Sequence, residues 1–486
     1  MGTATSDGKR TYIKDRLAEY FGFEAHGTDL RTEIIAGLTT FLTMSYIVVV
    51  NPSILAGTDV NFAVEGVQPA ISITGISQSA TFQMVAIVTI LSAALATFIM
   101  AVYANRPFAQ APGLALNAFF AFTVVGAMGI PWQVALAAVV VEGIIFIILT
   151  LIGAREYVIH LFPEPVKFAV GTGIGLFLAL IGFEAMGVVT GEGGTILSLG
   201  NLAQSPTAVL SIVGLFFTLA LYSRGIPGSI VIGIILTTLV GYGVTALGLV
   251  EEGVLVRDTL PRATYDITPI AGQFLEGIFG APAQGVDGFA FALVVFTFFF
   301  VDFFDTAGTL TGVSQAAGFL DENGNLPEIE KPLMADAIGT TVGGMLGTST
   351  VTTFIESSTG IEEGGRTGMT ALVVSLLFVA TIIFVPLAAG IPTYASHLAL
   401  VVVGIIMLGN VNDVNWDNIS HTIPAGLTIL IMPFTYNIGY GIAAGIVSYP
   451  IVKLAVGEWR DIHLGQWVLA GSFIVYFYVR TAGILG

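Results

Sequence analysis

Long apolar stretches that contain almost no charge constrain this chain more than any other feature. Four of them are about 20 residues long, the length of helix needed to cross the roughly 30 Å hydrocarbon layer of a bilayer. They are Ile34–Leu55, Met84–Val102, Val134–Leu151 and Met369–Ala388. Only 10% of the 486 residues are charged, against roughly 25% in an ordinary soluble domain. The sequence therefore predicts an all-α polytopic membrane protein.

Composition limits the chain further. The apolar segments leave room for roughly twelve to fourteen crossings and for no large soluble domain. The first 30 residues are polar, so we expect no cleavable signal and a first crossing that itself directs insertion. The absence of cysteine excludes disulfides and thiolate metal sites. A net charge of −17 disfavours nucleic acid as a partner and favours a source in concentrated salt.

Basic residues outside the spans follow a pattern when the chain is threaded from a cytoplasmic N-terminus. Arg106, Arg224 and Lys331 then fall inside, whereas the outside segments 126–131 and 190–205 contain no Lys or Arg. The positive-inside rule therefore predicts a multi-pass protein of the cell membrane with its N-terminus in the cytoplasm.

A long polar segment, 249–288, divides the chain into halves of about seven crossings, which then have opposite orientations. The third segment of each half is short and interrupted: Ala111–Phe119 in the first and Gly347–Glu356 in the second. Broken segments at matching positions of inverted repeats point to a transporter site near mid-membrane. The alternative is two ordinary helices softened by Gly and Thr, which membrane helices tolerate.

Carboxylates in apolar surroundings mark candidate ion or substrate sites, because charge is costly inside a bilayer. This chain has six such acids: Glu142, Glu184, Asp302, Asp305, Asp336 and Glu356. No Lys or Arg lies deep within a span, and a buried acid without a countercharge holds a proton more readily, as proton coupling requires. For Glu142, Glu184 and Asp336 a purely structural role is the stronger alternative.

Four residues stand out among the polar positions. Asp302 and Asp305 lie three residues apart, hence on one helix face, where each opposes ionisation of the other. Glu356 follows a run of hydroxyl residues where the second broken segment becomes helical, and a carboxylate there accepts N–H donors from an uncharged heterocycle. Asn117 occupies the matching zone of the first segment and both donates and accepts, with helix capping as its alternative role.

Four motifs are long enough to compare with known families: Thr32–Tyr46 with Asn51 and Pro52, Ala111–Ala118, Phe300–Thr309 and Gly347–Gly368. They resemble the AzgA-like purine permeases, the adenine, guanine and hypoxanthine branch of the nucleobase:cation symporters. This resemblance implies a fourteen-span fold like that of the uracil permease, built from two inverted seven-span repeats. It also implies that the third span of each repeat carries a short strand, that the two strands pair antiparallel, and that purine binds between a core domain and a gate domain.

The resemblance also divides the chain. We expect a cytoplasmic segment 1–30, core domain repeats 31–155 and 289–390, gate domain repeats 166–248 and 395–457, an extracellular loop 249–288 and a C-terminal segment 458–486. The apolar part of that last segment, Trp467–Val479, is short for a crossing.

Site roles follow from the same resemblance. We expect Glu356 to hydrogen-bond the purine, Asp302 to contact it or to take the coupling proton, and Asp305 to support the site. Asn117 braces the core strands, and Asn117 and Thr353 complete the expected substrate-binding set. Glu184 is a departure, because neutral residues are expected at this place in many relatives.

These observations predict a secondary transporter and not an enzyme. It imports hypoxanthine, guanine or adenine by proton symport and alternating access, without a cofactor or a metal site. Its expected partners are a purine base, a proton or a sodium ion, the lipid bilayer and a second copy in a homodimer. The alternative is a sodium-coupled nucleobase transporter or a xanthine/uracil transporter of the same fold. The acidic site disfavours an anion exchanger, and two aspartates on one helix disfavour an intramembrane aspartyl protease.

Overall fold

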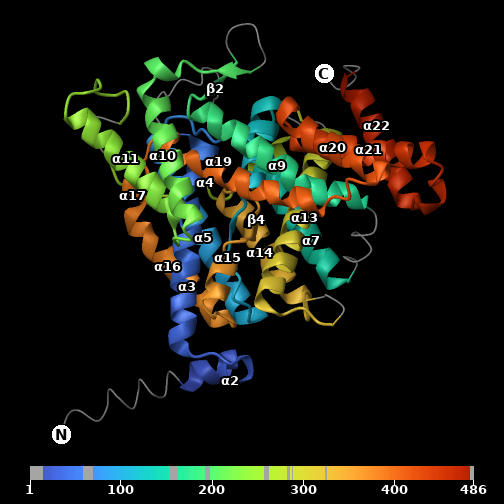
Figure 1. Ribbon diagram of the computed structural model, residues 1–486, viewed down its shortest axis with the longest axis horizontal. Coiled ribbons are helices and arrows are strands. Elements are labelled where there is room, and N and C mark those ends of the chain that lie inside the picture. The colour runs from blue at the N-terminus through green and yellow to red at the C-terminus, as the bar shows by residue number, and fades with distance from the viewer. Residues whose placement is uncertain are drawn as a thin grey trace.

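The computed structural model is a bundle of helices (Figure 1). It describes residues 15–57, 69–153, 162–191, 197–256, 262–281, 285–286, 288–322 and 326–481. Within these residues, ten helices are long and apolar enough to cross a membrane. They are Leu30–Ala56, Gln78–Ala104, Trp132–Leu151, Glu164–Ala185, Pro206–Ser223, Ser229–Ala246, Ala290–Gln315, Gly368–Ala388, Thr393–Asp413 and Ile438–Ala455. The predicted helical membrane protein is confirmed.

The elements of the chain's first half precede the long polar segment. They are α2 (Phe23–His26), α3 (Leu30–Met44), α4 (Ile47–Ala56), α5 (Gln78–Ile99), the π-helix η1 (Met100–Ala104), β1 (Gln110–Pro112), α6 (Leu114–Ala118), the π-helix η2 (Phe119–Ala127), α7 (Trp132–Leu151), α9 (Glu164–Ala185), β2 (Val189–Thr190), β3 (Ser198–Leu199), α10 (Pro206–Ser223) and α11 (Ser229–Ala246).

The second half begins inside that segment. Its elements are α12 (Phe274–Gly280), α13 (Gly288–Ala317), α14 (Glu330–Leu346), β4 (Val351–Thr353), α15 (Ser357–Glu362), α16 (Gly368–Thr381), α17 (Val385–Ala388), α18 (Thr393–Ser396), α19 (Leu398–Met407), α20 (Ile419–Thr435), α21 (Ile438–Ala455) and α22 (Leu464–Thr481).

The two interrupted segments pair with each other. Strands β1 and β4 are antiparallel, with Gln110 opposite Thr353 and Pro112 opposite Val351. The pair continues beyond the strands, since the Gly113 N–H donates to the Thr350 carbonyl at 3.0 Å. Each extended segment therefore satisfies backbone groups of the other, which a non-helical stretch buried in a bundle requires.

Most helix contacts fall into two sets. In one, α7 packs against α13 and α14, α5 against α14 and α16, and α3 against α15 and α16. In the other, α9 packs against α19, α20 and α21, while α10 packs against α11 and α19. Figure 1 shows α20 and α21 lying alongside α9. Small residues permit the close contacts: a Cβ at Gly143 would lie 2.8 Å from the Thr341 nitrogen.

The polar segment 249–288 contains a helix that the sequence does not predict. Its α12 packs against α7, and a Cβ at Gly277 would overlap the backbone of Gln133. At the other end of the chain, α22 includes Trp467–Val479 and packs against α21. Its Phe473 ring lies 5.5 Å from that of Phe296, so α22 is joined to the bundle.

Glu33, in the first turn of α3, fixes the start of α16. Its carboxylate is fully buried and accepts four hydrogen bonds, from the backbone N–H groups of Arg366, Thr367 and Thr370 and from the Thr370 hydroxyl. An acid at the beginning of a helix satisfies N–H groups that have no intrahelical acceptor. The first and the last sequence motifs thus meet in one contact.

We predict that Glu33→Gln lowers the free energy of unfolding by about 2 kcal/mol, because an amide NH2 then faces donors that need an acceptor. Thermal or chemical denaturation of the purified protein in detergent measures the loss. Glu164→Gln is the control, since Glu164 is an exposed acid in the first turn of α9. Equal stability of the two variants would contradict the assigned role of Glu33.

Candidate functional site

Hydroxyl side chains on and before strand β4 anchor it to the surrounding helices. Thr348 accepts from the Asn51 amide at 2.9 Å, and Thr350 donates to Glu142 at 3.2 Å. Thr352 lies 2.8 Å from the Thr306 hydroxyl. The run of threonines therefore supplies hydrogen bonds between the extended segment and helices α4, α7 and α13.

Asp336 of α14 accepts hydrogen bonds from both strands. Its carboxylate is 1% exposed and accepts from the Gln110 amide of β1 at 3.1 Å. It also accepts from the hydroxyls of Thr306 at 3.2 Å and Thr353 at 3.4 Å. Thr353, expected at the substrate, is itself 2% exposed and also accepts from Gln110 at 3.2 Å. Thr353 is therefore one of the buried residues that hold the two strands together.

Asp302 of α13 belongs to the same network. Its side chain is fully buried, accepts from Thr306 at 3.3 Å and lies close to the Glu142 carboxyl group. Glu142, Asp302 and Asp336, the buried acid cluster, thus come together from α7, α13 and α14.

Asn117 ties the two interrupted segments together. Its side chain is fully buried in α6, its amide oxygen accepts from the Ser349 hydroxyl, and its amide nitrogen donates to the Pro112 carbonyl at 3.4 Å. One end of the amide therefore contacts the segment before β4 and the other contacts β1.

Glu356 directly precedes helix α15 and is partly exposed. Its Oε1 accepts a hydrogen bond from the Tyr46 hydroxyl at 2.5 Å. Tyr46 was not among the predicted site residues, although it closes the first sequence motif, because nothing local in the sequence marks a partner on another helix.

Asp305 has different surroundings from Asp302. It is partly exposed, its Oδ2 lies 3.8 Å from where a Cβ of Gly113 would stand, and its charge interacts with that of Glu356. Residues three apart on a helix differ in direction by about 60°. Asp302 therefore faces the buried acid cluster, while Asp305 faces the start of α6 and Glu356.

Glu184 of α9 lies in the other set of helices, where its carboxylate accepts from the Tyr436 hydroxyl. Tyr436 follows α20 with a left-handed backbone, φ 52°, and its carbonyl accepts from Thr123 of η2 at 3.0 Å. Glu184, at a place where neutral residues are expected in many relatives, therefore has a hydrogen-bond partner at the junction of α20 and α21.

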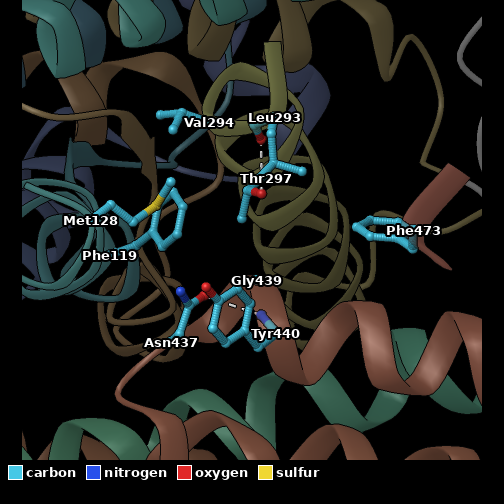
Figure 2. A pocket seen from close by; sticks show the side chains of 9 residues that line it. All are labelled: Phe119, Met128, Leu293, Val294, Thr297, Asn437, Gly439, Tyr440 and Phe473. Carbon is cyan, nitrogen blue, oxygen red and sulfur yellow. Dashed lines mark hydrogen bonds between the residues drawn. The ribbon is translucent and has the colours of Figure 1, made fainter. Parts of the chain in front are cut away.

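A small pocket lies between α13, η2 and α21, close to the same junction (Figure 2). None of the six acids lines it. Its lining residues are Phe119, Met128, Leu293, Val294, Thr297, Asn437, Gly439, Tyr440 and Phe473. Figure 2 shows the Asn437 and Tyr440 side chains on one side and Thr297 on the other, so the pocket lies between α13 of the first set and α21 of the second.

Comparison with known proteins decides the family. Residues 31–444 match the sequence model of the Permease family, Xan_ur_permease. The chain belongs to this permease family. The permease is 40% identical to the guanine/hypoxanthine permease PbuO of Bacillus subtilis over 94% of its own length and 100% of that protein. It is 38% identical to the adenine permease AdeP of Escherichia coli, over 94% and 95% of the two chains.

Solved structures show the same fold at lower identity. The transmembrane domain of the cyanobacterial bicarbonate transporter BicA matches 86% of the permease and 97% of its own chain, with a TM-score of 0.54 and 17% identity. The family resemblance drawn from the sequence motifs is confirmed. Because the family and these relatives are permeases, the protein is a transporter and not an enzyme.

We predict that Asp336→Ala lowers the free energy of unfolding by about 3 kcal/mol, because the Gln110, Thr306 and Thr353 donors lose their common acceptor. Asp336→Asn keeps one acceptor oxygen and should lose about 1 kcal/mol. Denaturation of both variants in detergent measures the difference. Equal losses would show that the hydrogen bonds to Asp336 do not stabilise the strand pair.

Proposed function

We propose that the permease imports a purine nucleobase, namely hypoxanthine, guanine or adenine, together with a cation. The observation that carries the proposal is Glu356, a partly exposed carboxylate beside two interrupted segments in a helical membrane protein. A carboxylate accepts ring N–H donors from an uncharged heterocycle. The names of PbuO and AdeP, a guanine/hypoxanthine permease and an adenine permease, support the same substrate class.

The proposed topology has about fourteen crossings in two inverted repeats of seven. Four segments add to the ten long helices: β1 with Leu114–Ala127, α14, β4 with α15, and Ile419–Thr435. The third segment of each repeat is then the one that contains a strand. Antiparallel pairing of β1 and β4 supports the arrangement, because inverted repeats run through the membrane in opposite directions.

The two sets of packed helices correspond to the proposed core and gate domains. The core comprises 31–155 and 289–390, and the gate comprises 166–248 and 395–457. Contacts of α3, α5, α7, α13, α14 and α16 with one another support the core, and those of α9, α19, α20 and α21 support the gate. Alternating access arises when the core moves against the gate.

Within the site, we assign Glu356 to the purine and Asn117 and Thr353 to holding the strands that position it. Asp302 takes the coupling proton, with Asp305 as a supporting charge next to Glu356. The two neighbouring buried acids Glu142 and Asp302 support proton coupling, since adjacent carboxyl groups without a countercharge oppose each other's ionisation. Substrate affinity and proton affinity are then linked in both directions.

Replacement of Glu356 by Gln should weaken hypoxanthine binding roughly tenfold to a hundredfold, because a hydrogen bond to a charged acceptor contributes about 1.5–3 kcal/mol. Uptake of radiolabelled hypoxanthine, guanine, adenine, xanthine and uracil into proteoliposomes tests both the residue and the substrate class. Glu362→Gln is the control, since Glu362 is exposed at the end of α15. Undiminished purine uptake by Glu356→Gln would remove Glu356 from the site.

Proton coupling predicts that a pH step, acidic on the side of entry, accelerates purine uptake by the unmodified permease. Asp302→Asn should abolish this acceleration, because the amide cannot take up the coupling proton, while Asp417→Asn, on the exposed surface, should preserve it. The measurement is the initial uptake rate with and without the pH step. Acceleration by a sodium gradient but not by pH would establish sodium coupling instead.

A further inference from the structure

We propose that Tyr46 is a positioning residue of the permease, and that its phenol fixes the Glu356 carboxylate for the incoming nucleobase. The inference rests on the proposed function, because Tyr46 acts on the purine only through Glu356. It goes beyond that function by adding a residue from the first crossing to a site otherwise built from the interrupted segments and α13.

Tyr46 is buried and lies within hydrogen-bonding distance of Glu356. The side chain is 1% exposed and lies at the break between α3 and α4, where neither helix includes it. Its hydroxyl donates to Glu356 Oε1 at 2.5 Å, the length of a charge-assisted O–H···O bond. Glu356 is only partly buried. The phenol therefore reaches the carboxylate from within the protein and leaves its accessible part for a ligand.

Neighbouring contacts hold this geometry. A Cβ at Gly360 would lie 2.6 Å from the Ala36 carbonyl, so α3 and α15 approach closely. The Thr43 hydroxyl lies 3.1 Å from that of Thr359, which donates to the Glu356 carbonyl at 2.8 Å. The helix before Tyr46 therefore contacts the segment that carries Glu356 at several points, and the distance between phenol and carboxylate is set by packing.

A hydrogen bond from the Tyr46 phenol leaves Glu356 able to bind the nucleobase and fixes its orientation. A carboxylate offers about four lone-pair positions on two oxygens, so one phenol donor leaves acceptor capacity for ring N–H groups. A side chain whose orientation is already fixed loses less conformational freedom when the ligand binds. Tyr46 thus lowers the cost of placing the acceptor, which acts on substrate affinity and not on the later movement of the domains.

Tyr46→Phe tests the inference with the loss of one oxygen atom. Loss of a hydrogen bond to a charged group predicts a roughly tenfold rise in the Kd of hypoxanthine and in the KM of uptake, with a maximal rate within about twofold of the unmodified permease. Tyr242→Phe is the matched control, because its phenol donates to the Gly390 carbonyl at 3.2 Å. An unchanged KM in Tyr46→Phe, or a fall in maximal rate alone, would overturn the proposal.

A double-mutant cycle separates this inference from the proposed function. Binding is measured by thermal shift at hypoxanthine concentrations up to the millimolar range, which also reports whether each variant is folded. In the Glu356→Gln background, Tyr46→Phe should change the Kd less than about twofold, because the acceptor that it positions has changed. Independent, additive effects would overturn the positioning role. A silent Glu356→Gln would refute the proposed function itself, whereas a silent Tyr46→Phe beside an impaired Glu356→Gln refutes the inference alone.

Discussion

The pairing of β1 with β4 is the interaction on which the rest of the site depends. A hydrocarbon layer offers no water to backbone N–H and C=O groups, so an extended segment persists among membrane helices only where protein groups satisfy it. Strand pairing does so for Gln110–Pro112 and Val351–Thr353, and the bond from the Thr340 hydroxyl to the Val351 carbonyl adds a helix. The start of helix α15, with Glu356, is thereby held inside the bundle.

The buried acid cluster gives the strand pair a chemical connection to the helices behind it. Asp336 accepts from both strands, through Gln110 and Thr353, and shares the Thr306 donor with Asp302. A change in protonation of Asp302 therefore alters hydrogen bonds that also position the strands. This arrangement joins the proposed proton site to strand β4 through Thr306, Asp336 and Thr353, and β4 leads into Glu356.

Sequence patterns predicted part of this arrangement. Hydropathy located the long crossings, and the Gly- and Thr-rich composition of Ala111–Phe119 and Gly347–Glu356 marked the interruptions. Buried acids without basic neighbours pointed to Asp302 and Glu356. The side-chain partners could not be predicted, because Gln110, which donates to Asp336, and Tyr46, which donates to Glu356, lie on distant segments. Helix α12 was missed because its contact with α7 depends on the close approach at Gly277.

Single hydrogen bonds cross the boundary between the two sets of helices, whereas the strands are joined along their backbones. The hydrogen bond from Thr123 to the Tyr436 carbonyl crosses it, next to the pocket that contains Asn437 and Tyr440. Tyr436 has a left-handed backbone, which is uncommon for a residue with a side chain and is retained here by bonds to Thr123 and Glu184. Single hydrogen bonds of this kind can be exchanged at lower cost than the paired backbone of two buried strands. The proposed movement is therefore a displacement of intact helix sets, with the purine site carried by one of them.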